Sequence, residues 1–336
     1  MDKFLLAALA VGLYVGWNIG SNDAANAMGA AVGGRVLSYR RAVSIIVLFV
    51  VMGAVLEGDK VMETVGKDIV VGPVCPLTEL PIVAIVALLA AGIWVTIATT
   101  VGLPVSTSQS VVGSVIGAGL LISIFEPSGV GASVHFDIIS RIGIAWVLSP
   151  AGAAIFAYLF YRIVAPFLRR IKSARVLNRV LKISVVGTGA FVAYTLGTND
   201  VGTAMGLVST IASVSILPVR LIALFGGIAL AFGAITYSRR VMQTVGTGIT
   251  RLDATTAFAA QFGAALIVWI FNQFGIPVST TQAIVGGVAG VGLVKGTAAV
   301  SKNELKKIVG AWILTPTAGA GLTFLFGLLA ILLMGV

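Results

Sequence analysis

The chain has 336 residues, of which 58% are hydrophobic and only 10% are charged, and its formal net charge is +10. A soluble domain usually carries about 25% charged residues, so this composition excludes a water-soluble fold and indicates a membrane protein. The net charge would suit nucleic acid, but the cations lie in short connections between apolar segments, so we expect no nucleic-acid partner.

Apolar stretches long enough to cross a bilayer follow one another along the whole chain. Spanning the hydrocarbon core takes roughly 20 mostly apolar residues, and a helix satisfies its own backbone hydrogen bonds there. The stretches cover residues 4–32, 42–57, 79–101, 108–125, 138–161, 183–208, 213–236, 254–273, 278–294 and 308–334. We therefore expect an all-α polytopic membrane protein with about 10–12 transmembrane segments.

Most of the basic residues lie in alternate connections between these segments. They are Arg35, Arg40 and Arg41, then the cations of residues 162–182, then Arg239, Arg240 and Arg251, then Lys295, Lys302, Lys306 and Lys307. The positive-inside rule places these connections in the cytoplasm. It predicts a multi-pass protein of the cell membrane with both termini outside. Residues 162–182 are expected to lie along the inner membrane surface, where anionic lipid attracts them.

The sequence contains four blocks twice, in the same order. The first copies are Trp17–Gly29, Val61–Gly66, Gly102–Leu120 and Ala145–Pro150, and the second copies are Tyr194–Gly206, Val241–Gly246, Gly275–Leu293 and Ala311–Pro316. Each copy holds five apolar segments, and five is odd, so the second copy should enter the membrane inverted. This predicts two inverted repeats, residues 1–161 and 183–336, joined by a basic cytoplasmic linker at 162–182. Inverted repeats with substrate sites at the membrane midplane are typical of secondary transporters.

Asp23 and Asp200 lie within apolar segments, each after the pattern Gly-Ser/Thr-Asn. A carboxylate at that depth is costly unless a cation, a proton or water lies beside it. Carboxylate and amide oxygens are hard ligands that suit a hard cation, so Asn22, Asp23, Asn199 and Asp200 are candidate Na⁺ ligands, with H⁺ as the alternative. The preceding glycine is expected to open the helix. The alternative structural role is to cap a broken helix.

The second motif is Gly-x-Pro-Val-Ser-Thr-x-Gln, at 102–109 and again at 275–282. Glycine and proline end one helix, and Ser-Thr can cap the next, so we expect re-entrant hairpins with broken helices at the midplane. Free N–H groups at a helix start bind anions. The candidate anion ligands are Ser106, Thr107, Ser108 and Gln109, together with Ser279, Thr280, Thr281 and Gln282. The alternative is an ordinary buried turn.

The duplicated Gly-x-Asn-Asp and Gly-x-Pro-Val-Ser-Thr-x-Gln patterns resemble the inorganic phosphate transporter (PiT) family over essentially the whole chain. The resemblance implies a homodimeric symporter that imports phosphate with Na⁺ or H⁺. It also implies that the Asn-Asp motifs bind the cations and that the Ser-Thr motifs bind phosphate or close the cation sites. Asn26 is replaced by Thr203 in the second copy, so the halves need not bind ions equally. No organic cofactor is expected.

Other functional classes remain open from the residues alone. A transporter of sulfate or another tetrahedral oxyanion would use the same ligands, and an anion channel would need no carboxylates. An enzyme is disfavoured because the sequence has no Gly-x-Ser-x-Gly, no His-Glu-x-x-His and no Cys/His cluster. Cys75 and His135 are single residues of their types, so a metal site built from Cys and His is not expected.

Overall fold

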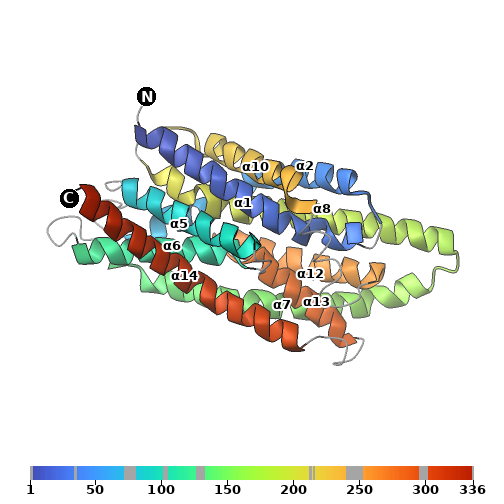
Figure 1. Ribbon diagram of the computed structural model, residues 1–336. Coiled ribbons are helices and arrows are strands. Elements are labelled where there is room, and N and C mark those ends of the chain that lie inside the picture. The colour runs from blue at the N-terminus through green and yellow to red at the C-terminus, as the bar shows by residue number, and fades with distance from the viewer. Residues whose placement is uncertain are drawn as a thin grey trace.

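The computed structural model describes residues 3–33, 36–71, 81–100, 105–125, 133–211, 214, 216–239, 253–294 and 302–334. The expectations that concern Cys75, residues 102–104, the loop cations Arg35, Arg240, Arg251 and Lys295, and the repeat block Val241–Gly246 lie outside these residues. Within them the protein is a bundle of long helices (Figure 1).

Each of the ten apolar stretches corresponds to one helix. The helices are α1 (Lys3–Gly33), α2 (Tyr39–Glu57), α5 (Pro81–Thr100), α6 (Thr107–Phe125), α7 (Phe136–Arg169), α8 (Ala174–Thr210), α10 (Val219–Thr236), α12 (Ala254–Gln273), α13 (Thr280–Val294) and α14 (Lys302–Met334). Among the described residues, nine helices are long and apolar enough to cross a membrane, and α13 is shorter, with 15 residues. The expected all-α membrane architecture is confirmed.

The connection after α2 is more ordered than a simple loop. It forms a short helix, α3 (Asp59–Glu63), and a π-helical turn, η1 (Thr64–Asp68). Strand β1 (Val70–Val71) then pairs antiparallel with β2 (Ser133–Val134), directly before α7. This small ribbon ties the end of η1 to the start of α7.

Two helical hairpins are arranged in opposite directions along the bundle. Figure 1 shows α5 and α6 near the end where α1 begins and α14 ends, whereas α12 and α13 extend toward the other end. The first turn of α6 and the first turn of α13 both reach the polar residues of α1 in the middle of the bundle. The two hairpins therefore bring their Ser-Thr motifs together from opposite sides.

Each hairpin packs against a helix of the other half of the chain. Helix α6 lies on α14, and α13 lies on α7. The contacts are equivalent in detail, because a Cβ at Gly113 would overlap the carbonyl of Pro316, and a Cβ at Gly286 would overlap the carbonyl of Pro150. Small residues at these crossings allow the helix backbones to touch.

The expectation that α1 and α8 open after their glycines is wrong. Both helices continue without interruption through the Asn-Asp motifs. Gly20 instead lies against the backbone of Leu230, and Gly197 lies against the backbone of Val50, where a Cβ would overlap a carbonyl oxygen. These glycines permit close helix packing, and the backbone carbonyls stay within the helices.

Residues 162–182 do not form a separate linker segment. Helix α7 extends to Arg169 and α8 begins at Ala174, so only residues 170–173 lie between them. A helix of 34 residues, the length of α7, measures about 51 Å and exceeds the roughly 30 Å hydrocarbon core. Arginine, lysine and leucine favour helix, which explains why the basic stretch continues both helices. Their connection extends beyond the neighbouring helix ends (Figure 1).

Candidate functional site

The predicted ligand residues all lie in the interior of the bundle. None of the twelve side chains is more than 8% exposed. They are Asn22, Asp23, Asn199, Asp200, Ser106, Thr107, Ser108, Gln109, Ser279, Thr280, Thr281 and Gln282. Such a concentration of buried polar groups in an apolar bundle requires partners within the protein or bound ions.

The two Ser-Thr motifs begin helices in the same way. The Ser106 hydroxyl accepts a hydrogen bond from the Gln109 backbone N–H at 3.2 Å, and the Ser279 hydroxyl accepts one from the Gln282 N–H at 3.1 Å. The sequence left the serine or the threonine of each motif as the cap, and the structure shows that Ser106 and Ser279 are the N-cap residues. The positive ends of the α6 and α13 dipoles point into the site, where they favour anions.

Asp23 joins both helix starts to α1. Its Oδ2 accepts a hydrogen bond from Thr107 at 2.7 Å, and its Oδ1 accepts one from Thr281 at 3.0 Å. Asn26 donates to the Thr281 hydroxyl at 2.8 Å and lies 3.4 Å from Asp23 Oδ1. One carboxylate thus holds residues from the first and second halves of the chain in one cluster.

Asp200 has a different environment, although it occupies the equivalent position. Its Oδ1 accepts a hydrogen bond from Asn199 at 2.6 Å. Its Oδ2 is buried and has no hydrogen-bond partner. Thr203, which replaces the asparagine of the first copy, donates to the Asp200 backbone carbonyl at 2.9 Å and does not reach α6. The two carboxylates are therefore not equivalent.

Asn199 also fixes the extended segment before α13. Its Nδ2 donates to the Val278 carbonyl at 2.7 Å, and the Val278 N–H donates to its Oδ1 at 3.1 Å. This pair of hydrogen bonds satisfies a backbone unit that lies outside any helix. Asn22, at the equivalent position of α1, donates to Thr99 at 3.2 Å instead.

Oxygen acceptors without partners cluster on the same motifs. Besides Asp200 Oδ2, the buried Oε1 atoms of Gln109 and Gln282 have no hydrogen-bond partner. Among the described side chains, no lysine or arginine forms an ion pair with either buried aspartate, and no group of three His, Cys, Asp or Glu residues could hold a metal. Oxygen-only ligands of this kind suit an alkali cation or a proton more than a transition metal.

Sequence reasoning missed two polar contributors on α12. The Asn272 amide donates to the Thr198 hydroxyl at 2.5 Å, directly before the second Asn-Asp motif. The Gln261 amide donates to the Ala27 carbonyl at 2.9 Å and accepts from Thr188 at 3.0 Å. Polar amides within an apolar segment were a signal, but their partners lie far away in the sequence.

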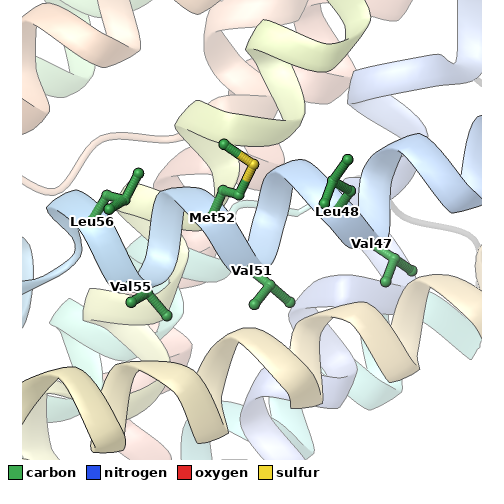
Figure 2. A pocket seen from close by; sticks show the side chains of 6 residues that line it. All are labelled: Val47, Leu48, Val51, Met52, Val55 and Leu56. Atoms are coloured by element: carbon green, nitrogen blue, oxygen red, sulfur yellow. The ribbon is translucent and has the colours of Figure 1, made fainter.

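A groove on the surface of α2 is unrelated to this cluster. It is lined by Val47, Leu48, Val51, Met52, Val55 and Leu56. Figure 2 shows the valines pointing to one side of the helix, and Leu48, Met52 and Leu56 to the other. Because every lining side chain is apolar, this groove cannot bind an ion or phosphate.

Comparison with known proteins gives consistent matches over nearly the whole chain. The phosphate transporter family model matches residues 19–323. A Pyrococcus furiosus protein named as a phosphate permease is 33% identical, covering 96% of both chains. The chloroplastic inorganic phosphate transporter 2-1 of Arabidopsis thaliana is 27% identical, covering 95% of this chain and 71% of its own length. A solved sodium-dependent phosphate transporter superposes with a TM-score of 0.84 at 27% identity, covering 97% of this chain and all of the other.

Proposed function

Because the chain belongs to the phosphate transporter family, and is therefore a transporter and not an enzyme, we propose that it imports inorganic phosphate by symport with Na⁺. The observation that carries this proposal is the hydrogen bonding of Asp23 to hydroxyls from both hairpins. The same hydroxyls are the donors that phosphate would need. The name of the structural neighbour supports Na⁺ as the coupling ion.

This arrangement suggests how the two substrates are coupled. Without a cation, the hydroxyl protons of Thr107 and Thr281 are used by the Asp23 carboxylate. A cation on Asp23 would take over the negative charge, and the hydroxyls could then turn their protons to a phosphate oxygen. Phosphate would next be held by these hydroxyls and by the starts of α6 and α13. Binding of the anion would therefore require the cation first.

Asp200 is proposed as the second cation ligand. Its unpartnered Oδ2 and the free Oε1 atoms of Gln109 and Gln282 provide oxygen lone pairs inside the bundle. A bound Na⁺ would satisfy these groups without requiring a buried arginine. The roles of Asn22 and Asn199 in this scheme are to orient the neighbouring groups as well as to offer amide oxygens.

We propose that the two halves of the chain are inverted repeats and that one structural unit of the bundle rocks against the other during transport. The exchanged packing of α6 on α14 and of α13 on α7 supports this relation. The start of α1 and the end of α14 lie at the same end of the bundle, which fits two termini on one side of the membrane (Figure 1). The distribution of basic residues among the loops favours the outer side for both termini. A homodimer in the cell membrane with lipid around it completes the proposal.

The test is radiolabelled phosphate uptake into proteoliposomes that hold the purified protein. An inward Na⁺ gradient should drive uptake, and an inward H⁺ gradient alone should not. Uptake driven only by H⁺ would make Asp23 and Asp200 proton carriers. Absence of uptake under both gradients, with sulfate transported in its place, would reject phosphate as the substrate.

A further inference from the structure

A further carboxylate, Glu57, lies at the end of a candidate membrane-spanning helix and outside the site described above. It is the last residue of α2 and is half-buried. Its Oε2 accepts hydrogen bonds from Trp269 Nε1 at 3.2 Å and from Gln273 Nε2 at 2.9 Å, both on α12. The Tyr194 phenol faces the same carboxylate. Groups from the second half of the chain thus converge on a carboxylate of the first half.

Gln273 is held at both ends of its amide. Its N–H group points to the Glu57 carboxylate, and its Oε1 accepts a hydrogen bond from the Lys60 ammonium at 2.8 Å. The amide dipole is therefore aligned between an anion and a cation, which strengthens both hydrogen bonds. We call Glu57, Lys60, Trp269 and Gln273 the Glu57 network.

The stability of α2 does not explain a glutamate at this position. A negative charge in the last turn of a helix opposes the helix dipole, and the last turn of α2 holds no basic residue. Partial burial of the charge adds a desolvation cost. The free energy that offsets these costs must come from the contacts that Glu57 makes with α12.

These contacts lead directly to the substrate site. After Gln273 the chain turns at Gly275, whose φ of 68° is left-handed and where a Cβ would lie only 3.0 Å from the Lys60 carbonyl oxygen. Three residues later Val278 is held by Asn199, and Thr281 then donates to Asp23. The Glu57 network therefore fixes the end of α12 from which the second Ser-Thr motif continues.

Among the described residues, the α5–α6 hairpin shows no counterpart to this network. In the repeat alignment Tyr237 stands at the position of Glu57, and Thr100 stands at the position of Gln273. Thr100 donates to the Ile97 carbonyl within its own helix. In the part of the chain that the structure describes, anchoring by charged groups is seen at the α12–α13 hairpin.

We propose that Glu57 is a positioning residue for transport: acting through Trp269 and Gln273, it holds the α12–α13 hairpin in the register in which Thr281 meets Asp23. This role rests on the proposed phosphate and Na⁺ symport. It goes beyond that function because Glu57 contacts neither candidate ion site. Loss of the network should release the hairpin and weaken cation and phosphate binding together, since one motif serves both.

The first measurement is hydrogen–deuterium exchange of residues 269–282 in the full-length detergent-solubilised protein. Glu57→Ala should raise exchange in this segment about tenfold or more, since two hydrogen bonds to a charged acceptor are lost. Glu57→Gln keeps an acceptor oxygen and should have a smaller effect. Lys60→Met, at an exposed position, should act in the same direction and serves if Glu57→Ala does not fold.

The matched control is the neighbouring pair Glu63 and Lys67, which are exposed and form an ion pair with each other at 3.9 Å. Glu63→Ala should leave exchange of 269–282 unchanged. Equal exchange in wild type and both Glu57→Ala and Lys60→Met, or an equal increase in Glu63→Ala, would overturn the proposal.

Uptake kinetics separate positioning from simple destabilisation. Glu57→Ala should raise the Na⁺ concentration for half-maximal uptake and the phosphate KM by roughly tenfold each, with partial recovery in Glu57→Gln. A lower maximal rate with unchanged half-saturation would refute positioning. If wild type shows no phosphate uptake, the proposed function fails, whereas the exchange data still decide whether Glu57 anchors the hairpin.

Discussion

The unpartnered oxygen of Asp200 leads to a prediction about stability in Na⁺. Asp200 is 0% exposed, and its Oδ2 has no hydrogen-bond partner. Leaving a buried acceptor unsatisfied costs about 1–3 kcal/mol, and more for a charged group. Asp23 adds electrostatic repulsion from the same interior. Without a cation, Asp200→Asn should therefore be more stable than wild type by at least about 1 kcal/mol.

Na⁺ should reverse this order. A cation that binds only the folded protein stabilises it by about 2.7 kcal/mol when its concentration is roughly 100 times the dissociation constant. Na⁺ should stabilise wild type by about this amount of free energy. Na⁺ should stabilise Asp200→Asn much less, because the charged ligand is gone. The assay is thermal unfolding in detergent, in NaCl and in choline chloride of equal ionic strength.

Asp137→Asn provides the control, because Asp137 is an exposed acid in the first turn of α7. Its response to Na⁺ should equal that of wild type. Two results would refute the reasoning. One is a Na⁺-dependent increase in the melting temperature of Asp200→Asn that is as large as that of wild type. The other is a melting temperature of Asp200→Asn in choline chloride that is lower than that of wild type.

Three further predictions test the packing, the anion ligands and the helix start. Gly197→Ala should lower stability by about 1–3 kcal/mol, because its Cβ would overlap a backbone carbonyl, whereas Gly187→Ala on the same helix meets no atom within 4 Å and should not; equal melting temperatures would contradict this. Thr281→Val should reduce phosphate uptake about tenfold by removing the hydroxyl that bonds Asp23, and wild-type kinetics would remove Thr281 from the site. Ser279→Ala should cost about 1 kcal/mol of stability through loss of the α13 cap, measured as a lower unfolding midpoint; an unchanged midpoint would mean that the cap is not needed.

Local sequence signals predicted the architecture well. Hydropathy located every long helix, because a membrane helix must be apolar along its length and this property can be read from the local sequence alone. Capping of α6 and α13 by the Ser-Thr pairs was also predictable, since a cap depends on residues three positions away. The structure then identified Ser106 and Ser279 as the capping residues. The four duplicated blocks indicated which segments would be equivalent.

Other features depended on contacts that no local pattern encodes. The sequence suggested that Gly20 and Gly197 open their helices, but close packing against α10 and α2 uses these glycines and keeps the helices continuous. The basic stretch at 162–182 appeared to be a linker, but it continues α7 and α8 because charged residues outside the hydrocarbon core can remain helical.

The sequence by itself determined that this chain is a helical membrane protein with two similar halves and with acidic and Ser-Thr motifs in each. Only the tertiary structure decided which hydrogen-bond partners each motif has. Asp23 binds hydroxyls from both hairpins, whereas Asp200 keeps an oxygen without a partner. Identical motifs differ here because their partners come from other helices, up to 258 residues away along the chain, and those helices differ between the halves.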